Sequence, residues 1–300
     1  MEMEEGSTKA SNLMATQSIT RAGEALATSR EKAVPVGMAG VLSILSVAVA
    51  LLAAVAAATG LLAPSVYRDG PSWVAQARGQ DLVTVVVVVP LMLAAQVAAR
   101  RGSTKAFLVW LGCVGYIAYS YAIYAFSAHF NSLFLVYVAT FGIGTYTLVF
   151  GLAGVDAARV ARTFGQRTPT RLVGIVLVAM SALTALMWLG QDVPALMSGQ
   201  VPSDVLDAGL LTNPTHVLDL GLVLPACVVA GFLLARRRAW GFVLGPYFLV
   251  NFAVLGVAIV SMTLFMLIDG QPFNVALSVV FSLWTLMSAA LAWRLLSDVR

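Results

Sequence analysis

Charged residues are scarce in this sequence. Asp, Glu, Lys and Arg make up 11% of its 300 residues and hydrophobic residues make up 60%, whereas an ordinary soluble domain is roughly 25% charged. A water-soluble fold of this composition could not cover its surface with polar side chains. The composition therefore excludes an ordinary soluble domain, and the lack of a folded basic domain argues against nucleic acid as a partner.

Cysteine is also scarce, with only Cys113 and Cys227 in the chain. Each lies in an apolar run, where a thiol packs as a small hydrophobic group. The sequence therefore indicates neither a disulfide framework nor a cysteine-based metal site. The first apolar run begins near Val34 and is about twice as long as the apolar core of a cleavable signal peptide, which has roughly 7–15 residues. We expect this run to be a retained membrane span.

The sequence contains long runs without charged residues. A helix needs roughly 20 apolar residues to cross a bilayer, so the length of each run gives the number of spans. The run from Ala106 to Val155 contains no charged residue, which predicts two helices with a polar turn at 128–131. The Asp-Gly-Gln-Pro segment at 269–272 predicts another turn. The sequence thus predicts an all-α membrane protein with eight transmembrane helices, at about 34–64, 81–99, two within 106–155, 172–190, 215–235, 239–268 and 274–293.

Lysine and arginine are shared unequally between alternate loops. The N-terminal tail, the loops 100–105, 155–171 and 236–238, and the C-terminus hold 16 of the 18, while the other side holds only Arg68 and Arg78. Positive residues are retained on the cytoplasmic side, so we expect both termini in the cytoplasm and the chain in the cell (inner or plasma) membrane. The aspartates expected at or near the outer face are Asp69, Asp81, Asp192, Asp204, Asp207, Asp219 and Asp269.

The predicted spans form two halves with a similar layout. In each half a long outer loop precedes a span that has a central proline, Pro90 or Pro225, and ends at an arginine cluster. This layout favours a parallel 4+4 repeat, although helical hairpins and basic stop signals also recur without duplication. The predicted organisation is a disordered cytoplasmic tail at 1–33, a four-helix half at 34–154, a cytoplasmic linker at 155–171 and a second half at 172–300.

Ionisable residues inside a bilayer mark function by default, and this chain offers few of them. Asp81, His216 and Asp219 are the membrane-embedded candidates, all expected near the outer surface, and Asn251 and the tyrosines of the third span lie deeper. Asn213-Pro214 predicts a helix start, after which His216 and Asp219 share a face. The predicted ligand-binding residues are Asp81, Tyr121, Tyr124, His129, Asn131, His216 and Asp219.

A metal site is the sharper hypothesis for His129, His216 and Asp219, because imidazole and carboxylate groups bind Zn²⁺ and other divalent ions. Their spacing matches no metal motif, and hydrogen bonding at the interface explains the same residue types. Tyr121 and Tyr124 likewise fit either an aromatic belt or a pocket with Asn131, which the loop at 67–81 would cover. No cofactor is indicated.

The two outer arginines, Arg68 and Arg78, are expected to pair with the nearby Asp69 or Asp81. An anionic ligand is the alternative partner for them. The pairing is the simpler interpretation, because the carboxylates are close in sequence.

Three short segments carry a resemblance to other proteins: Gln80-Asp81-Leu82-Val83-Thr84, Phe130-Asn131-Ser132-Leu133-Phe134-Leu135, and 213–220. On these segments the chain, from about 65 to 250, resembles a group of bacterial polytopic membrane proteins with no known activity. The resemblance implies a multi-pass fold and carries no functional residue over.

Three functions fit these observations. A small-molecule binder or transporter is favoured by the paired layout, the prolines and the outer polar residues. A membrane sensor or accessory subunit is the second hypothesis, and a membrane-embedded enzyme, metal-dependent or not, is the third. The sequence has no soluble catalytic domain, nucleotide-binding motif or nucleophile triad, which weakens the enzyme hypothesis. The lipid bilayer and a small molecule are the expected partners, and the oligomeric state is not indicated.

Overall fold

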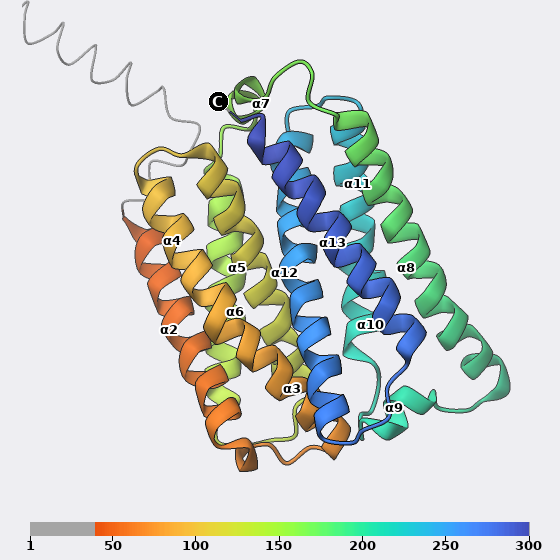
Figure 1. Ribbon diagram of the computed structural model, residues 1–300. Helices are drawn as coiled ribbons and strands as arrows, with labels where there is room; N and C mark the ends of the chain where they lie inside the picture. The colour runs from red at the N-terminus through yellow and green to blue at the C-terminus, as the bar shows by residue number, and fades with distance from the viewer. Residues whose placement is uncertain (1–39, 300) are drawn as a thin grey trace, which may run out of the picture.

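A computed structural model describes residues 40–299, so the predicted tail at 1–33 and the first residues of the first span lie outside the described residues. Eight helical segments are long and apolar enough to cross a membrane, which confirms the predicted fold class (Figure 1). The spans are α2 (Val41–Leu62), α3–η3–α4 (Pro71–Val83, Thr84–Val88, Val89–Arg100), α5 (Thr104–Ser127), α6 (Phe134–Ala153), α8 (Thr170–Ser198), α10–η4–α11 (Pro214–Leu218, Asp219–Val223, Leu224–Ala235), α12 (Gly241–Ile268) and α13 (Val275–Ser297).

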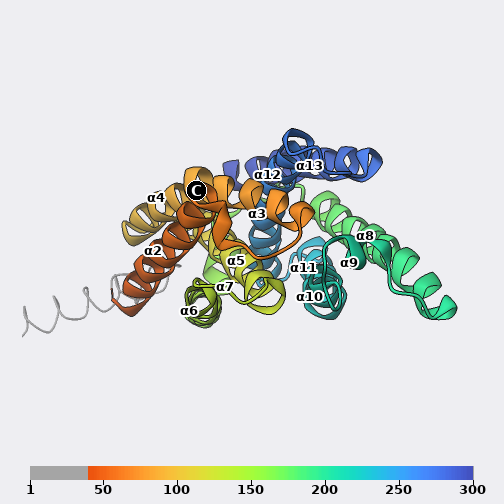
Figure 2. The same ribbon diagram turned by 90° about the horizontal axis from the view of Figure 1, so that it is seen from below.

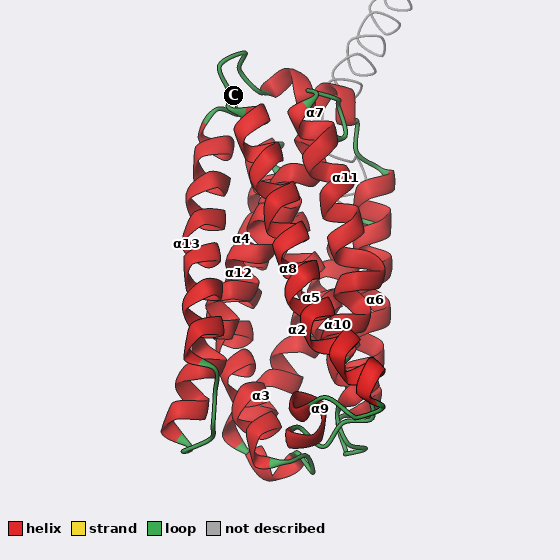
Figure 3. Ribbon diagram, turned by 90° about the vertical axis from the view of Figure 1, so that its right-hand side faces the viewer, coloured by secondary structure: helices red, strands yellow, loops and turns green. Residues whose placement is uncertain are grey.

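Short helices and loops join these spans, and the described residues form no strand beyond one isolated bridge between Phe164 and Val299 (Figure 3). The short helices are η2 (Pro64–Val66), α7 (Ala157–Thr163) and α9 (Ser203–Asp207). The turn predicted at 128–131 lies between α5 and α6, which confirms that prediction. The predicted linker 155–171 contains α7.

Two predicted loops are partly wrong. The segment 64–80 was predicted as a loop, but the second span already begins at Pro71, and α8 continues beyond the predicted end at Gly190 to Ser198. The prediction ended these spans too early because it placed polar side chains outside the membrane. A polar side chain can lie within a span when another helix supplies its hydrogen-bond partner. Asp81 is consequently not the first residue of its span but lies ten residues after Pro71, roughly 15 Å along the helix at 1.5 Å per residue.

The two ends of the bundle differ in charge. The arginine-rich end comprises the loops 101–103, 154–169 and 236–240, and the aspartate-rich end comprises the loops 63–70, 128–133, 199–213 and 269–274. In Figure 1 the first contains α7 and the C-terminus, at the top, and the second contains α9, at the bottom.

The first four spans close around their own centre, whereas the last four do not. Helix α6 packs along both α5 and α2, but α13 packs along α12 and touches α8 only sparsely. Helix α12 also packs against α3 and α5 and so joins the two halves. Figure 2 shows α12 between α2, α4 and α6 on one side and α8 on the other. The second half is therefore left open between α8 and α13.

Small residues allow the closest helix contacts, as expected where lipid removes the hydrophobic drive for helices to associate. A Cβ added to Gly79 of α3 would lie 2.5 Å from the backbone N and Cα of Met262 in α12. Gly174 of α8 and Gly231 of α11 face each other in the same way. At these positions the packing leaves no room for a side chain.

The two spans with central prolines contain matching π-helical turns. Segment η3 is followed by Val89 and Pro90, and segment η4 by Leu224 and Pro225. The Val89 N–H donates to the Thr84 carbonyl and the Leu224 N–H to the Asp219 carbonyl, five residues back rather than four. A proline ring clashes with the carbonyl four residues before it in a regular α-helix, and the wider turn relieves that clash.

We expect the Gly79→Ala variant to be destabilised by about 1–3 kcal/mol, because its methyl group forces α3 away from α12. The matched control is Gly142→Ala in α6, where an added Cβ meets nothing within 4 Å and alanine is favoured in a helix. Thermal unfolding of both purified variants in detergent measures the difference. Equal midpoints for the two variants would contradict this packing.

Candidate functional site

Asp81 is the centre of a buried hydrogen-bonded cluster. Its side chain accepts hydrogen bonds from the Tyr67 hydroxyl at 2.5 Å and the Tyr124 hydroxyl at 3.0 Å, and the residue is 2% exposed. Trp73 packs edge-on against both tyrosine rings. Burial and the Asp81 carboxylate raise the pKa of Tyr67, which lies in the loop between two spans. A Cβ on Gly60 of α2 would overlap the carboxylate, so α2 closes the remaining side.

Tyr121 and Tyr124 belong to the same cluster. Their rings stack with centroids 5.5 Å apart, and the Tyr121 hydroxyl donates to the Ala53 carbonyl at 2.9 Å. The polar groups predicted here as ligand contacts, including Asp81, are all hydrogen-bonded within the protein. These hydrogen bonds join α2, α3 and α5.

His129 and Asn131 lie in the turn between α5 and α6 and connect loops at the aspartate-rich end. The His129 ring nitrogens lie 3.1 Å from the Arg68 carbonyl and 3.3 Å from the Gly209 carbonyl, and its backbone N–H donates to Asp69. Burial raises the pKa of the Asp69 carboxyl. The Asn131 side chain bonds to the backbone within the same turn. These residues support loop structure.

Arg78 does not pair with Asp69 or Asp81 as predicted. Its guanidinium lies 2.8 Å from the carboxylate of Asp269 and over the ring of Phe265. Because Asp269 follows α12, the ion pair connects α3 to the turn before α13. The pairing predicted from closeness in sequence is wrong, because Arg78 lies within a helix that begins at Pro71 and there it contacts Asp269.

His216 lies near the start of the sixth span, where Asn213 caps the helix as predicted by accepting hydrogen bonds from two backbone N–H groups. The imidazole stacks on Trp188 of α8 with ring centroids 4.3 Å apart. Its Nδ1 lies 2.9 Å from Asp192, also in α8. His216 therefore holds the start of the sixth span against α8.

Asp219 is the first residue of the π-helical turn and is 9% exposed. It accepts hydrogen bonds from the Tyr119 hydroxyl of α5 at 3.0 Å and from Nε1 of Trp188 at 2.9 Å. Three spans thus meet at one carboxylate. Both donors are neutral, so this buried carboxylate has no Lys or Arg partner among residues 40–299.

The described chain shows no arrangement suited to the hypothesised metal. Residues 40–299 contain no group of three His, Cys, Asp or Glu side chains that could hold an ion. His129 bonds to loop carbonyls, His216 to Asp192, and Asp219 to Tyr119 and Trp188. The hypothesis is not supported, because closeness to one membrane face did not bring the three side chains together.

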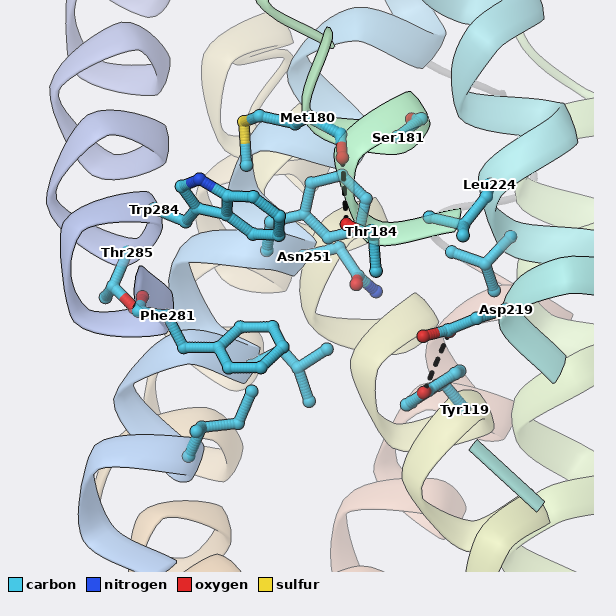
Figure 4. A pocket seen from close by; sticks show the side chains of 15 residues that line it. Tyr119, Met180, Ser181, Thr184, Asp219, Leu224, Asn251, Phe281, Trp284 and Thr285 are labelled. Carbon is cyan, nitrogen blue, oxygen red and sulfur yellow. Dashed lines mark hydrogen bonds between the residues drawn. The ribbon is translucent and has the colours of Figure 1, made fainter. Parts of the chain in front are cut away.

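A pocket lies beside Asp219, where α13 diverges from α8 (Figure 4). About 580 Å³ of empty space, part of which is open to the outside, lies between α5, α8, η4–α11, α12 and α13. Its polar lining is Tyr119, Ser181, Thr184, Asp219, Asn251 and Thr285, and its aromatic walls are Phe252, Phe281 and Trp284. Several of these residues also line a larger cavity of about 1400 Å³, partly open to the outside, that reaches the aspartate-rich end. Together they form a crevice from that end into the bundle.

Asn251 of α12 is the unsatisfied polar group in this pocket. The residue is 6% exposed, and its amide makes no hydrogen bond with the described part of the chain. Its amide atoms are not among the side-chain atoms that are sealed without a partner, so they border open space. Figure 4 shows the amide directed into the pocket, on the side of Asp219. An amide that lines a pocket without a protein partner can donate to and accept from a bound molecule, so this group is suited to a ligand.

The hydroxyl groups around the pocket are oriented by their own helices. Ser181, Thr184 and Thr285 each donate to the backbone carbonyl four residues earlier. Their protons are therefore used, and their oxygen lone pairs are left as hydrogen-bond acceptors.

Sequence reasoning found Asp219 but not most of its surroundings. The sequence marks Asn251 and the tyrosines of the third span only as deeper polar groups, and neither Asn251 nor Tyr119 is among the predicted ligand-binding residues. Trp188, Phe281 and Trp284 carried no signal, because an aromatic residue in an apolar span is ordinary.

Comparison with known proteins adds no assignment. No protein-family model, curated protein or solved structure matches this chain.

We expect Asp81→Ala to destabilise the protein by about 2–4 kcal/mol, because two buried phenol groups lose their shared acceptor. Asp207→Ala is the control, since Asp207 is exposed in α9. Thermal unfolding in detergent compares the two. A midpoint for Asp81→Ala equal to that of the control would show that the Asp81 cluster does not stabilise the fold.

Proposed function

We propose that this protein is a small-molecule transporter of the cell membrane, with its substrate bound in the pocket beside Asp219. The observation that carries the proposal is the unpaired, buried amide of Asn251 facing a pocket. Ligand sites are typically concave and mostly apolar, with a few polar groups that orient the ligand. The pocket beside Asp219 has that composition.

The backbone around the pocket supports transport over passive binding. Transporter sites are often formed where transmembrane helices depart from regular geometry, and π-helical turns occur frequently at functional sites. Segment η4 begins at Asp219 and leads directly to Pro225, so the carboxylate lies at the irregular point of its span. A change in this turn would move Asp219 relative to α8 and α12.

A catalytic role is less well supported by the same lining. The hydroxyls of Ser181, Thr184 and Thr285 donate to backbone carbonyls rather than to a base. An activated nucleophile needs a base within hydrogen-bond reach, and the described pocket lining does not provide that pair.

The matching π-helical turns support the proposal that the two halves arose by duplication. Aligning Pro90 with Pro225 places Thr84 at Asp219, and each of these two residues contacts a tyrosine hydroxyl of α5, Tyr116 or Tyr119. In this proposal the first half is the closed copy and the second half is the copy that opened into a pocket. The different positions of α6 and α13 account for the difference.

The charge distribution supports an orientation with both termini in the cytoplasm, and hence a pocket that opens toward the extracytoplasmic side. In intact cells we expect an impermeant thiol reagent to label Gln200→Cys, at the aspartate-rich end, and not Gln166→Cys, at the arginine-rich end. Both glutamines are exposed loop residues, and the natural Cys113 and Cys227 are fully buried. The reverse labelling pattern would invert the orientation.

Transport itself is tested with proteoliposomes loaded with a mixture of amino acids, sugars, amines and carboxylates. We expect the wild-type protein to release at least one solute class and Asn251→Leu to lower that rate at least tenfold, because the ligand loses its amide contact. Gln166→Leu, an amide lost from an exposed loop, should retain the wild-type rate. Retention of every solute class by the wild-type protein would overturn the transport proposal.

A further inference from the structure

Most of the polar groups of the pocket offer hydrogen-bond acceptors, and the N–H groups of Asn251 and Trp284 are its free donors. Asp219 has a carboxylate, and the hydroxyls of Ser181, Thr184 and Thr285 have already donated their protons to backbone carbonyls. Asn251 adds one amide oxygen beside its N–H₂ group. A ligand that satisfies such a lining must supply several donors.

Lysine and arginine are missing from the same surroundings. No lysine or arginine lines the pocket or the larger cavity in the described part of the chain. Arg78, the arginine on the neighbouring α3, is held by Asp269. His216, the nearby ionisable base, pairs with Asp192, so the hydrogen-bond donors to the Asp219 carboxylate are the neutral Tyr119 and Trp188.

The mouth of the crevice carries the same sign of charge as its base. Asp204 and Asp207 line the larger cavity together with His216 and Asp219. Carboxylates along a cleft with low-dielectric walls attract cations and raise their local concentration. An anion would meet like charge both at the mouth, at Asp204 and Asp207, and at the base, at Asp219.

The aromatic walls complete the description of the ligand. Phe252, Phe281 and Trp284 line the pocket, and Figure 4 shows Phe281 and Trp284 on the side away from Asp219. Aromatic faces accept apolar groups and attract cations through the ring quadrupole. The pocket thus combines an acceptor-rich point with an aromatic enclosure.

We infer that the ligand is a small organic cation: a protonated amine with an apolar, preferably aromatic, body, whose N–H groups donate to Asp219 and the Asn251 oxygen. This inference rests on the proposed function and names its substrate class. The apolar body lies between the rings of α12 and α13, and the ammonium group occupies the space in which Asn251 has no protein partner.

The test uses three compounds of similar size and different charge: 2-phenylethylamine, 2-phenylethanol and phenylacetate. Binding to the purified full-length protein in detergent is measured by calorimetry at pH 7. We expect the amine to bind at least tenfold more tightly than the alcohol, and phenylacetate to bind most weakly of the three. Asp219→Asn, which keeps a side chain able to bond with Tyr119 and Trp188, should remove the preference for the amine. Asp156→Asn is the control, because Asp156 is exposed at the arginine-rich end and asparagine can still accept the hydrogen bond from the Arg159 backbone N–H; it should leave the preference for the amine unchanged.

A second measurement does not depend on the folding of an Asp219 variant. A cysteine at Thr184→Cys is treated with methanethiosulfonate reagents bearing either a trimethylammonium or a sulfonate group. We expect the cationic reagent to react at least tenfold faster, after correction for their rates with free thiol, and 2-phenylethylamine to slow it.

The outcomes separate the two proposals. Tighter binding of the alcohol or of phenylacetate, with a loss of that binding in Asn251→Leu, would overturn the cation inference and leave the proposed ligand site intact. Equal reaction of the two reagents would also overturn the cation inference. Failure of all three compounds to bind, combined with no solute release from proteoliposomes, would overturn both.

Discussion

Carboxylates buried within an apolar bundle constrain this structure more than any other groups, because hydrocarbon offers them no hydrogen-bond donor. Asp81 is satisfied by two tyrosines, one from the loop before its own span and one from α5. Asp219 is satisfied by a tyrosine of α5 and a tryptophan of α8. Each carboxylate therefore fixes the position of helices that are distant in sequence, and α5, which supplies a tyrosine to both, is the most deeply buried span.

The two carboxylates have different surroundings because the outer helices of the two halves are placed differently. Around Asp81, α2 and α6 close the bundle, and Gly60 lets the α2 backbone approach the carboxylate. Around Asp219, α13 follows α12 and leaves α8, so the equivalent space stays empty and exposes the amide of Asn251. The Asp81 carboxylate thus stabilises a packed cluster in the first half, whereas the Asp219 carboxylate faces a pocket in the second half.

Much of the fold could be predicted from the sequence, and less of the site. The eight spans, the turn at 128–131 and the cap at Asn213 follow from local properties: apolar length, polar punctuation and capping chemistry. The prediction failed at 64–80, where Arg78 and Asp81 are polar yet helical, because Asp269 and the tyrosines that satisfy them come from distant segments. The predicted site residues lie in three separate places: the cluster around Asp81, the turn between α5 and α6, and the contacts of the sixth span with α8. Their expected position at one membrane face did not determine which side chains contact one another.

The sequence by itself determined that the chain is an all-α membrane protein with eight spans. The reason is that apolar length and charge are local properties, and they decide whether a segment can lie in the hydrocarbon core of a bilayer. Only the tertiary structure decided which polar residues are used up in packing and which face open space. Asp81 and Asp219 are both lone aspartates in apolar spans, and nothing local distinguishes them. Their difference depends on the path of α13 relative to α8, which is set by packing such as that of Gly256 against Thr285 and so by contacts between residues far apart in the chain.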